Sequence, residues 1–102
     1  MNILLCCAAG MSTSLIVTKM EKAAASKGIS AHIWAVSESV VRSEIEEADV
    51  LLLGPQVRFL LNEMKNICGE TNIPVEVIDM MSYGLCDGAA ILEQAIKLIE
   101  YK

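Results

Sequence analysis

The stretch that could carry chemistry begins with two adjacent cysteines, Cys6 and Cys7, and continues through small and hydroxyl residues. An apolar run leads into it, and a helical pattern begins near Ser12. A strand, a tight loop and a helix N-terminus together form an anion site, because backbone N–H groups point inward and the helix dipole favours negative charge. The dipole also favours the thiolate form of a cysteine, which is the nucleophile. The stretch therefore predicts a cysteine that accepts a phosphoryl group.

The two cysteines are expected to have different roles. Cys6 continues the apolar run and is predicted to be a small core residue, because free cysteine is among the most buried residue types. Cys7 stands where the strand is expected to stop and the loop to begin, which is the position of a phosphate-loop nucleophile. We therefore take Cys7 as the candidate catalytic residue.

Three chemistries use a cysteine in such a loop. A low-molecular-weight tyrosine phosphatase has the pattern Cys-x5-Arg, but Thr13 stands at the arginine position and Asp79 lacks the proline that follows the general acid. A thiol-redox protein would need a resolving partner, and a ring joining Cys6 to Cys7 would be strained. A phosphoryl carrier needs only amides and hydroxyls around the phosphate. The missing arginine favours the carrier, and the phosphatase and the redox protein remain alternatives.

Composition limits the class of protein. The chain has 102 residues, which predicts one domain spanning 1–102, and its 54% apolar but only 4% aromatic residues predict an aliphatic core. A net charge of −5 disfavours nucleic acids and anionic membranes as direct partners. No apolar run is long enough to cross a bilayer, and no signal peptide is evident. The cysteine spacings match no zinc pattern, so we expect no metal or cofactor, and free thiols indicate the cytoplasm.

Strand-like and helix-like segments alternate four times, which predicts a parallel sheet with helices on both faces. The expected strands are 2–6, 29–36, 50–53 and 75–78. The expected helices are 12–27, 37–47, 57–67 and 88–101, with Asp87 capping the last. Four strands in this alternation predict the order 2-1-3-4, with the switch point between the first and third strands. The Cys7 loop would then lie beside Gly54 to Gln56, with the loop 79–87 next along.

Two further features have both a structural and a functional interpretation. His32 is the only histidine, but it falls in mid-strand rather than at the carboxyl edge of the sheet, so a surface role is expected. Met80, Met81 and Tyr83 lie in the loop 79–87. They could close over the site or form a soft apolar docking surface, or they could pack under the loop.

Three motifs carry a resemblance to a known family. They are Cys7 to Ser14 (CAAGMSTS), the run 48–56 (ADVLLLGPQ), and the pattern 74–88 with PVEVID, Tyr83-Gly84 and Asp87-Gly88. Together they resemble the enzyme IIB component of the sugar phosphotransferase system, in the lactose/cellobiose/chitobiose family, over essentially the whole chain. The resemblance implies a four-stranded parallel sheet with helices on both faces, similar to that of low-molecular-weight tyrosine phosphatases.

The resemblance also implies a function. In that family the loop cysteine, here Cys7, takes phosphate from a phosphohistidine of the IIA component. It then donates the phosphate to a sugar, by default a β-linked disaccharide such as cellobiose, chitobiose or lactose, bound to the membrane component IIC. The implied carrier is a cytoplasmic phosphotransferase that reaches the inner face of the membrane only through IIC. The residue pattern leaves no long apolar stripe unassigned, so we expect a monomer.

The resemblance assigns roles to further residues around the cysteine. The phosphate would be held by the amides and hydroxyls of Ala8, Ala9, Gly10, Met11, Ser12, Thr13 and Ser14. A docking rim, used by both partners in turn, would be formed by Met11, Gln56, Met80, Met81 and Tyr83.

Overall fold

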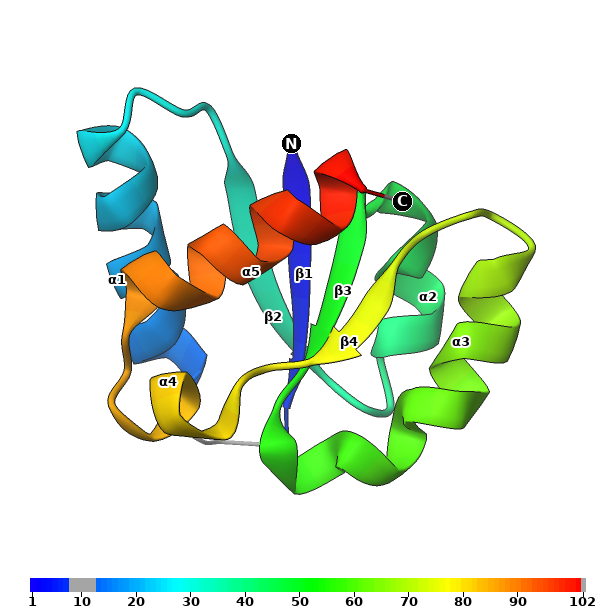
Figure 1. Cartoon of the computed structure of the whole chain (residues 1–102). Helices are drawn as coiled ribbons and strands as arrows, with labels where there is room; N and C mark the ends of the chain where they lie inside the picture. Colours follow the sequence, from blue (N-terminus) through cyan, green and yellow to red (C-terminus); the bar gives the residue numbers. More distant parts are fainter. Residues whose placement is uncertain (8–12, 102) are drawn as a thin grey trace.

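The computed structural model describes residues 1–7 and 13–101, and their strands form one parallel sheet (Figure 1). The four strands of this part of the chain are β1 (Asn2–Cys7), β2 (His32–Ser37), β3 (Val50–Leu53) and β4 (Val75–Val77). Their order is β2-β1-β3-β4, and every neighbouring pair is parallel. The predicted sheet and its strand order are confirmed.

The central strands are buried on both faces, as their continuous apolar sequences predict. Side chains alternate along β1, so that Ile3, Leu5 and Cys7 enter one core cluster while Leu4 and Cys6 enter the other. The aliphatic core is therefore two layers, one on each side of the sheet.

Helices cover both faces (Figure 1). One face carries α1 (Thr13–Ser26), α5 (Gly88–Glu100) and the short α4 (Met80–Gly84), and the other carries α2 (Val41–Glu44) and α3 (Leu61–Gly69). Two 3₁₀ segments, η1 (Ile45–Glu47) and η2 (Pro55–Leu60), precede β3 and α3. We call the first side the Cys7 face and the second the Cys6 face.

On the Cys7 face, α1 and α5 meet at a glycine. A Cβ added to Gly88 would lie 2.4 Å from the carbonyl carbon of Lys19 and 2.6 Å from the nitrogen of Met20. Real Cβ atoms essentially never come so close to main chain. Only a glycine at the start of α5 therefore allows this helix crossing.

All the predicted strands and helices except the strand 50–53 have different boundaries in the structure. The first strand runs one residue further, through Cys7, and the second begins at His32 rather than at residue 29. His32 is thus the first residue of β2 and not a mid-strand residue, because a turn at 27–28 and the irregular residues 29–31 separate β2 from α1. The helix predicted at 37–47 is split into α2 and η1. The first four residues of the helix predicted at 57–67 belong to η2, which has a non-helical backbone at Val57, and the α-helix itself begins at Leu61.

The predicted loop 79–87 is wrong in part, because it contains α4. Asp79 caps this helix: its Oδ2 accepts hydrogen bonds from the nitrogen of Ser82 at 3.0 Å and from its hydroxyl at 2.9 Å. A helix of five residues is too short to show a 3.6-residue period, so the pattern missed it. The cap predicted at Asp87 is confirmed, since its side chain accepts from the nitrogen of Ala90.

Candidate functional site

Cys7 is the last residue of β1, so it belongs to the carboxyl edge of the sheet. The strands end at the bottom of Figure 1. The chain goes from β1 to α1 on one face and from β3 to η2 and α3 on the other. The carboxyl edge between β1 and β3 is therefore the switch point of the sheet, where open α/β folds bind their ligands. The Cys7 side chain is 2% exposed.

Gly54, the residue after β3, brings main chain directly against Cys7. Its nitrogen donates a hydrogen bond to the Cys6 carbonyl at 2.8 Å. A Cβ added to Gly54 would lie 2.9 Å from the Cys7 Sγ and 2.9 Å from the Gln56 Oε1. The predicted neighbourhood of Cys7 and the segment 54–56 is confirmed, and the sulfur leaves no room for a larger residue at Gly54.

Tyr83 approaches the same sulfur from α4. Its hydroxyl donates to the Cys7 Sγ over 3.9 Å and accepts a hydrogen bond from the Gln56 Nε2 at 3.0 Å. Tyr83 is 8% exposed and packs in the core cluster that contains Cys7. Three segments distant in sequence thus place Cys7, Gln56 and Tyr83 together.

The position of α4 is fixed by the cap at Asp79 and by a side chain of α5. The Gln94 Nε2 donates to the Val77 carbonyl at 2.9 Å, and the Gln94 Oε1 accepts from the Asp79 nitrogen at 3.1 Å. If another parallel strand lay beside β4, one of its residues would bond to these same two groups, the Val77 carbonyl and the Asp79 N–H. The Gln94 amide therefore takes the place of a fifth strand at this point. Hydrogen bonds from the main chain and side chain of Ser82 hold the pKa of Asp79 below its ordinary value.

Cys6 has a different environment although it precedes Cys7 directly. It is fully buried on the Cys6 face, and this burial, followed by nearby Cys7 and Glu38, raises its pKa to about 11 while Arg42 opposes the shift. Burial likewise raises the pKa of Cys68, in α3, to about 11. Cys6 is confirmed as a core thiol and Cys68 is a second one, so neither is a nucleophile near neutral pH.

The residues of the expected docking rim divide into two groups. Met80 is 64% exposed, Met81 is 73% exposed and Gln56 is also exposed, so packing of the two methionines under the loop is excluded. Tyr83 is buried and lies beneath the rim rather than on it. Exposed apolar side chains that the sequence pattern did not single out lie on the neighbouring elements: Leu15 in α1, Phe59 in η2 and Leu85 after α4.

Most of the expected phosphate loop lies outside the described residues, namely Ala8, Ala9, Gly10, Met11 and Ser12. Thr13 is the first residue of α1, and Ser14 follows it with an exposed side chain.

The strand register adds a residue that no sequence pattern pointed to. Ser37, the last residue of β2, is the partner of Cys7, and its hydroxyl lies 2.9 Å from that of Ser39. His32 pairs with Asn2 at the opposite end of β2, so it is remote from Cys7. Arg58 is exposed, and its Nη1 donates to the Pro55 carbonyl at 3.4 Å.

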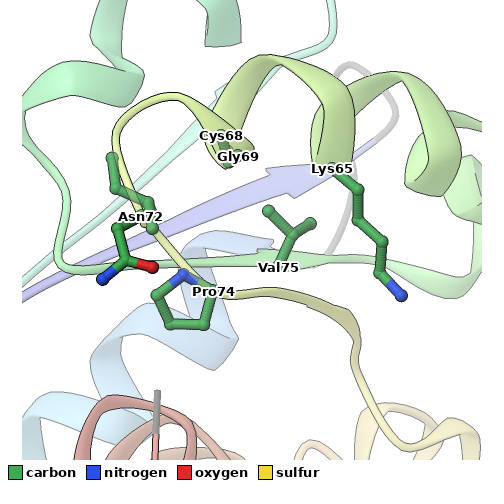
Figure 2. Close-up of a pocket in the computed structure, with 7 residues that line it drawn as sticks. Lys65, Cys68, Gly69, Asn72, Pro74 and Val75 are labelled. Atoms are coloured by element: carbon green, nitrogen blue, oxygen red, sulfur yellow. The ribbon is translucent and has the colours of Figure 1, made fainter.

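A pocket of about 320 Å³ opens at the other edge of the sheet, where β4 begins (Figure 2). Figure 2 shows Lys65, Asn72, Pro74 and Val75 around it, with Cys68 and Gly69 above them at the end of a helix. The one thiol of this pocket is that of Cys68, whose pKa is raised, so the pocket offers no nucleophile comparable to Cys7. Among the residues that the structure describes, no group of histidine, cysteine, aspartate and glutamate could hold a metal ion. Within the same ranges, no helix has the length and apolar character to cross a membrane.

Comparison with known proteins adds an independent finding. The family model described as "PTS system, Lactose/Cellobiose specific IIB subunit" matches residues 2–94. The chain is 50% identical over 98 residues to the "PTS system oligo-beta-mannoside-specific EIIB component" of Bacillus subtilis (strain 168), covering 96% of this chain and 95% of that protein.

Two further relatives extend the comparison to another sugar and to a solved structure. The chain is 42% identical over 102 residues to the "PTS system cellobiose-specific EIIB component" of Lactococcus lactis subsp. lactis (strain IL1403), covering 95% of this chain and 94% of that protein. The solution structure of a cellobiose-specific phosphotransferase IIB component from Borrelia burgdorferi superposes with a TM-score of 0.82. It is 42% identical, and the match covers 100% of this chain and 94% of that one.

Proposed function

Since this chain belongs to the lactose/cellobiose-specific IIB subunits of the sugar phosphotransferase system, we propose that Cys7 carries the phosphoryl group. IIB components are phosphotransferases that transfer phosphate to sugar. The observation that supports Cys7 is its position: its sulfur lies at the switch point of the sheet, against the main chain of Gly54 and the hydroxyl of Tyr83. Cys6 and Cys68 are buried in the opposite core with raised pKa values.

The proposed reaction has two in-line displacements at phosphorus. First, the Cys7 thiolate attacks the phosphorus of a phosphohistidine on the IIA component; the S–P bond forms, the N–P bond breaks, and the imidazole keeps the electron pair. Second, a sugar hydroxyl oxygen attacks the same phosphorus, the S–P bond breaks, and the electron pair returns to the sulfur. The proton of the sugar hydroxyl passes to a base of the membrane component IIC.

The groups proposed to hold the phosphoryl oxygens are the amides and hydroxyls of residues 8–14. The helix α1 begins within this segment, at Thr13, and its dipole favours a dianionic group. The close packing of Gly54 and Tyr83 around the sulfur would limit the access of water to the phosphocysteine. This protection is what a carrier requires and a phosphatase does not.

Both partners are proposed to dock on the exposed apolar side chains around the site. Met80 and Met81 supply an adaptable surface, and Leu15, Gln56, Phe59 and Leu85 extend it. Met11 is proposed to take part in the same docking. Because IIA and IIC must each reach the same sulfur, they would bind in turn. We propose a monomeric, single-domain carrier in the cytoplasm that meets the membrane only through IIC.

The proposed sugar is a β-linked disaccharide or oligosaccharide such as cellobiose, chitobiose or lactose. The two curated relatives described above are named for oligo-β-mannoside and for cellobiose. The choice between these sugars would depend on IIC, which binds the sugar.

The test is peptide-level mass spectrometry after incubation with phosphoenolpyruvate, the general phosphotransferase proteins and a cognate IIA. We expect one phosphoryl group on Cys7, dependent on IIA, absent from Cys7→Ser and retained in the matched variant Cys6→Ser. No adduct, or an adduct on Cys6 or His32, would overturn the proposal. Phosphatase and thiol-redox assays on the same sample would then decide between the alternatives.

A further inference from the structure

The single proton of the Tyr83 hydroxyl lies between two groups. The Gln56 Nε2 is a donor and approaches the Tyr83 oxygen at 3.0 Å, so the oxygen accepts there. The hydroxyl proton is then available for the Cys7 Sγ, 3.9 Å away. The geometry orders the three groups as amide, hydroxyl and sulfur, with each donor aimed at the next acceptor.

A donor that faces a sulfur favours the thiolate over the thiol. A hydroxyl that already accepts a hydrogen bond is polarised and becomes a stronger donor. We propose that Tyr83 is a further catalytic residue: its hydroxyl, oriented by Gln56, stabilises the Cys7 thiolate as nucleophile and again as leaving group. The leaving-group role rests on the function proposed for Cys7, whereas the effect on the free thiolate does not.

The surroundings keep the Tyr83 hydroxyl at the sulfur. The ring is buried in the Cys7-face core cluster, where hydrogen bonds are less weakened by water. The helix that carries it is capped by Asp79, whose nitrogen is held by Gln94 and whose carboxylate accepts from the first turn. The hydroxyl is thus pre-positioned for the reacting atom.

The role is distinct in the two transfers. When the thiolate attacks the phosphohistidine, stabilisation by Tyr83 raises the fraction of thiolate but lowers its intrinsic reactivity, so the net gain is modest. When the sugar oxygen attacks the phosphocysteine, the S–P bond breaks and the electron pair develops on the sulfur. The Tyr83 hydrogen bond then strengthens as the charge grows, while its proton stays on the phenolic oxygen. We therefore expect the second transfer to depend on Tyr83 more than the first.

The first test is the pH profile of Cys7 alkylation by iodoacetamide, followed at the level of peptides in the unphosphorylated protein. Tyr83→Phe is expected to shift the profile upward by about one pH unit, which makes labelling near neutral pH roughly tenfold slower. The matched control is Tyr101→Phe, because Tyr101 is exposed at the end of α5, and its profile should coincide with that of the original protein. A Tyr83→Phe profile that coincides with both would overturn the proposal.

The positioning role of Gln56 has its own readout. Gln56→Ala is expected to shift the alkylation profile in the same direction but by less, and the double variant should match Tyr83→Phe alone. Additive shifts would contradict the claim that Gln56 acts through Tyr83. Labelling of the buried Cys6 and Cys68 reports unfolding in the same samples. If Tyr83→Phe unfolds, Gln56→Ala becomes the test, because Gln56 is exposed. An unshifted Cys7 alkylation profile in Gln56→Ala would then contradict the proposal.

The leaving-group role is tested with phosphorylated protein and membranes that contain IIC and sugar. Tyr83→Phe should slow the loss of phosphate to the sugar about tenfold and its acquisition from IIA by less. Equal slowing of both steps would contradict the leaving-group role. If Cys7 carries no phosphate at all, the proposed function fails while the alkylation profile still tests the thiolate role.

Discussion

The two faces of the sheet carry one cysteine each at adjacent positions of the same strand, and the two thiols have opposite surroundings. Cys6 points into a core of aliphatic side chains that leaves its thiol protonated, whereas Cys7 points toward a glycine, a glutamine and a tyrosine at the switch point. The difference arises from the two-residue alternation of strand side chains. A one-residue shift in register would exchange the two thiols, so strand register determines which cysteine faces the site.

The largest effect expected from this comparison concerns helix packing. Gly88→Ala on the Cys7 face should lower the free energy of unfolding by about 3 kcal/mol, because the new methyl group meets the main chain of α1. Gly69→Ala on the Cys6 face is the matched control. Among the described residues, no atom outside its own stretch of helix lies within 4 Å of its added Cβ, so the substitution should be neutral or stabilise by about 0.5 kcal/mol. Urea unfolding measures both, and equal effects would show that the two faces pack alike.

The second effect is a loss of folding stability at alkaline pH, which we attribute to the buried thiols of the Cys6 face. The pKa of Cys6 rises from 9.0 to about 11 in the folded protein. Above pH 9 the unfolded chain ionises this thiol first, so the free energy of unfolding should fall as the pH rises toward 11, by about 2 kcal/mol for this thiol. Cys68 should add a fall of the same sign.

Variants separate these contributions. Cys6→Ala should be less stable than the original protein at pH 7 but should lose less stability between pH 9 and 11. The control is Cys86→Ala, because Cys86 is partly exposed and lies outside the Cys6-face core. Its pH dependence should match that of the original protein. Identical alkaline slopes for Cys6→Ala and the original protein would disprove the assignment of the loss to Cys6.

The smallest expected effect is the loss of stability when one polar contact is removed from each face of the sheet. Gln94→Ala should cost about 1 kcal/mol, because it removes hydrogen bonds to Val77 and Asp79 at the sheet edge. Glu63→Ala removes an exposed ion pair with Arg42 on the Cys6 face and should cost less than about 0.5 kcal/mol. Thermal unfolding of the two variants checks the order, and a larger loss for Glu63→Ala would reverse the comparison.

Much of the fold followed from local patterns. The strand 50–53 was predicted with its observed bounds because it is a short apolar run, buried throughout and ended by Gly54 and Pro55. The strand order followed from the alternation of strands and helices, and with it the approach of Gly54 to Cys7. These features depend on periodicity and chain breaks, which a single sequence contains.

The parts of the site that could not be predicted depend on tertiary packing. Tyr83 was expected on the rim, but the five-residue helix α4, which has too few residues to show a period, turns it toward the Cys7 sulfur. Ser37 could not be predicted as a neighbour of Cys7 either, because their proximity follows from the strand register alone. Exposed apolar residues such as Phe59 also look like core residues in a sequence.

The Gln94 amide has a consequence for how partners can recognise this protein. It occupies the main-chain groups of Val77 and Asp79 through which an extended segment of another protein would add to the sheet beside α4. Partners that approach this side must therefore recognise side chains and cannot pair with the main chain of a strand edge. Main-chain pairing would be indifferent to sequence, whereas contacts with side chains let several partners bind the same surface in turn. Slow hydrogen exchange of the Asp79 amide, compared with fast exchange in Gln94→Ala, would show that this edge is closed in solution.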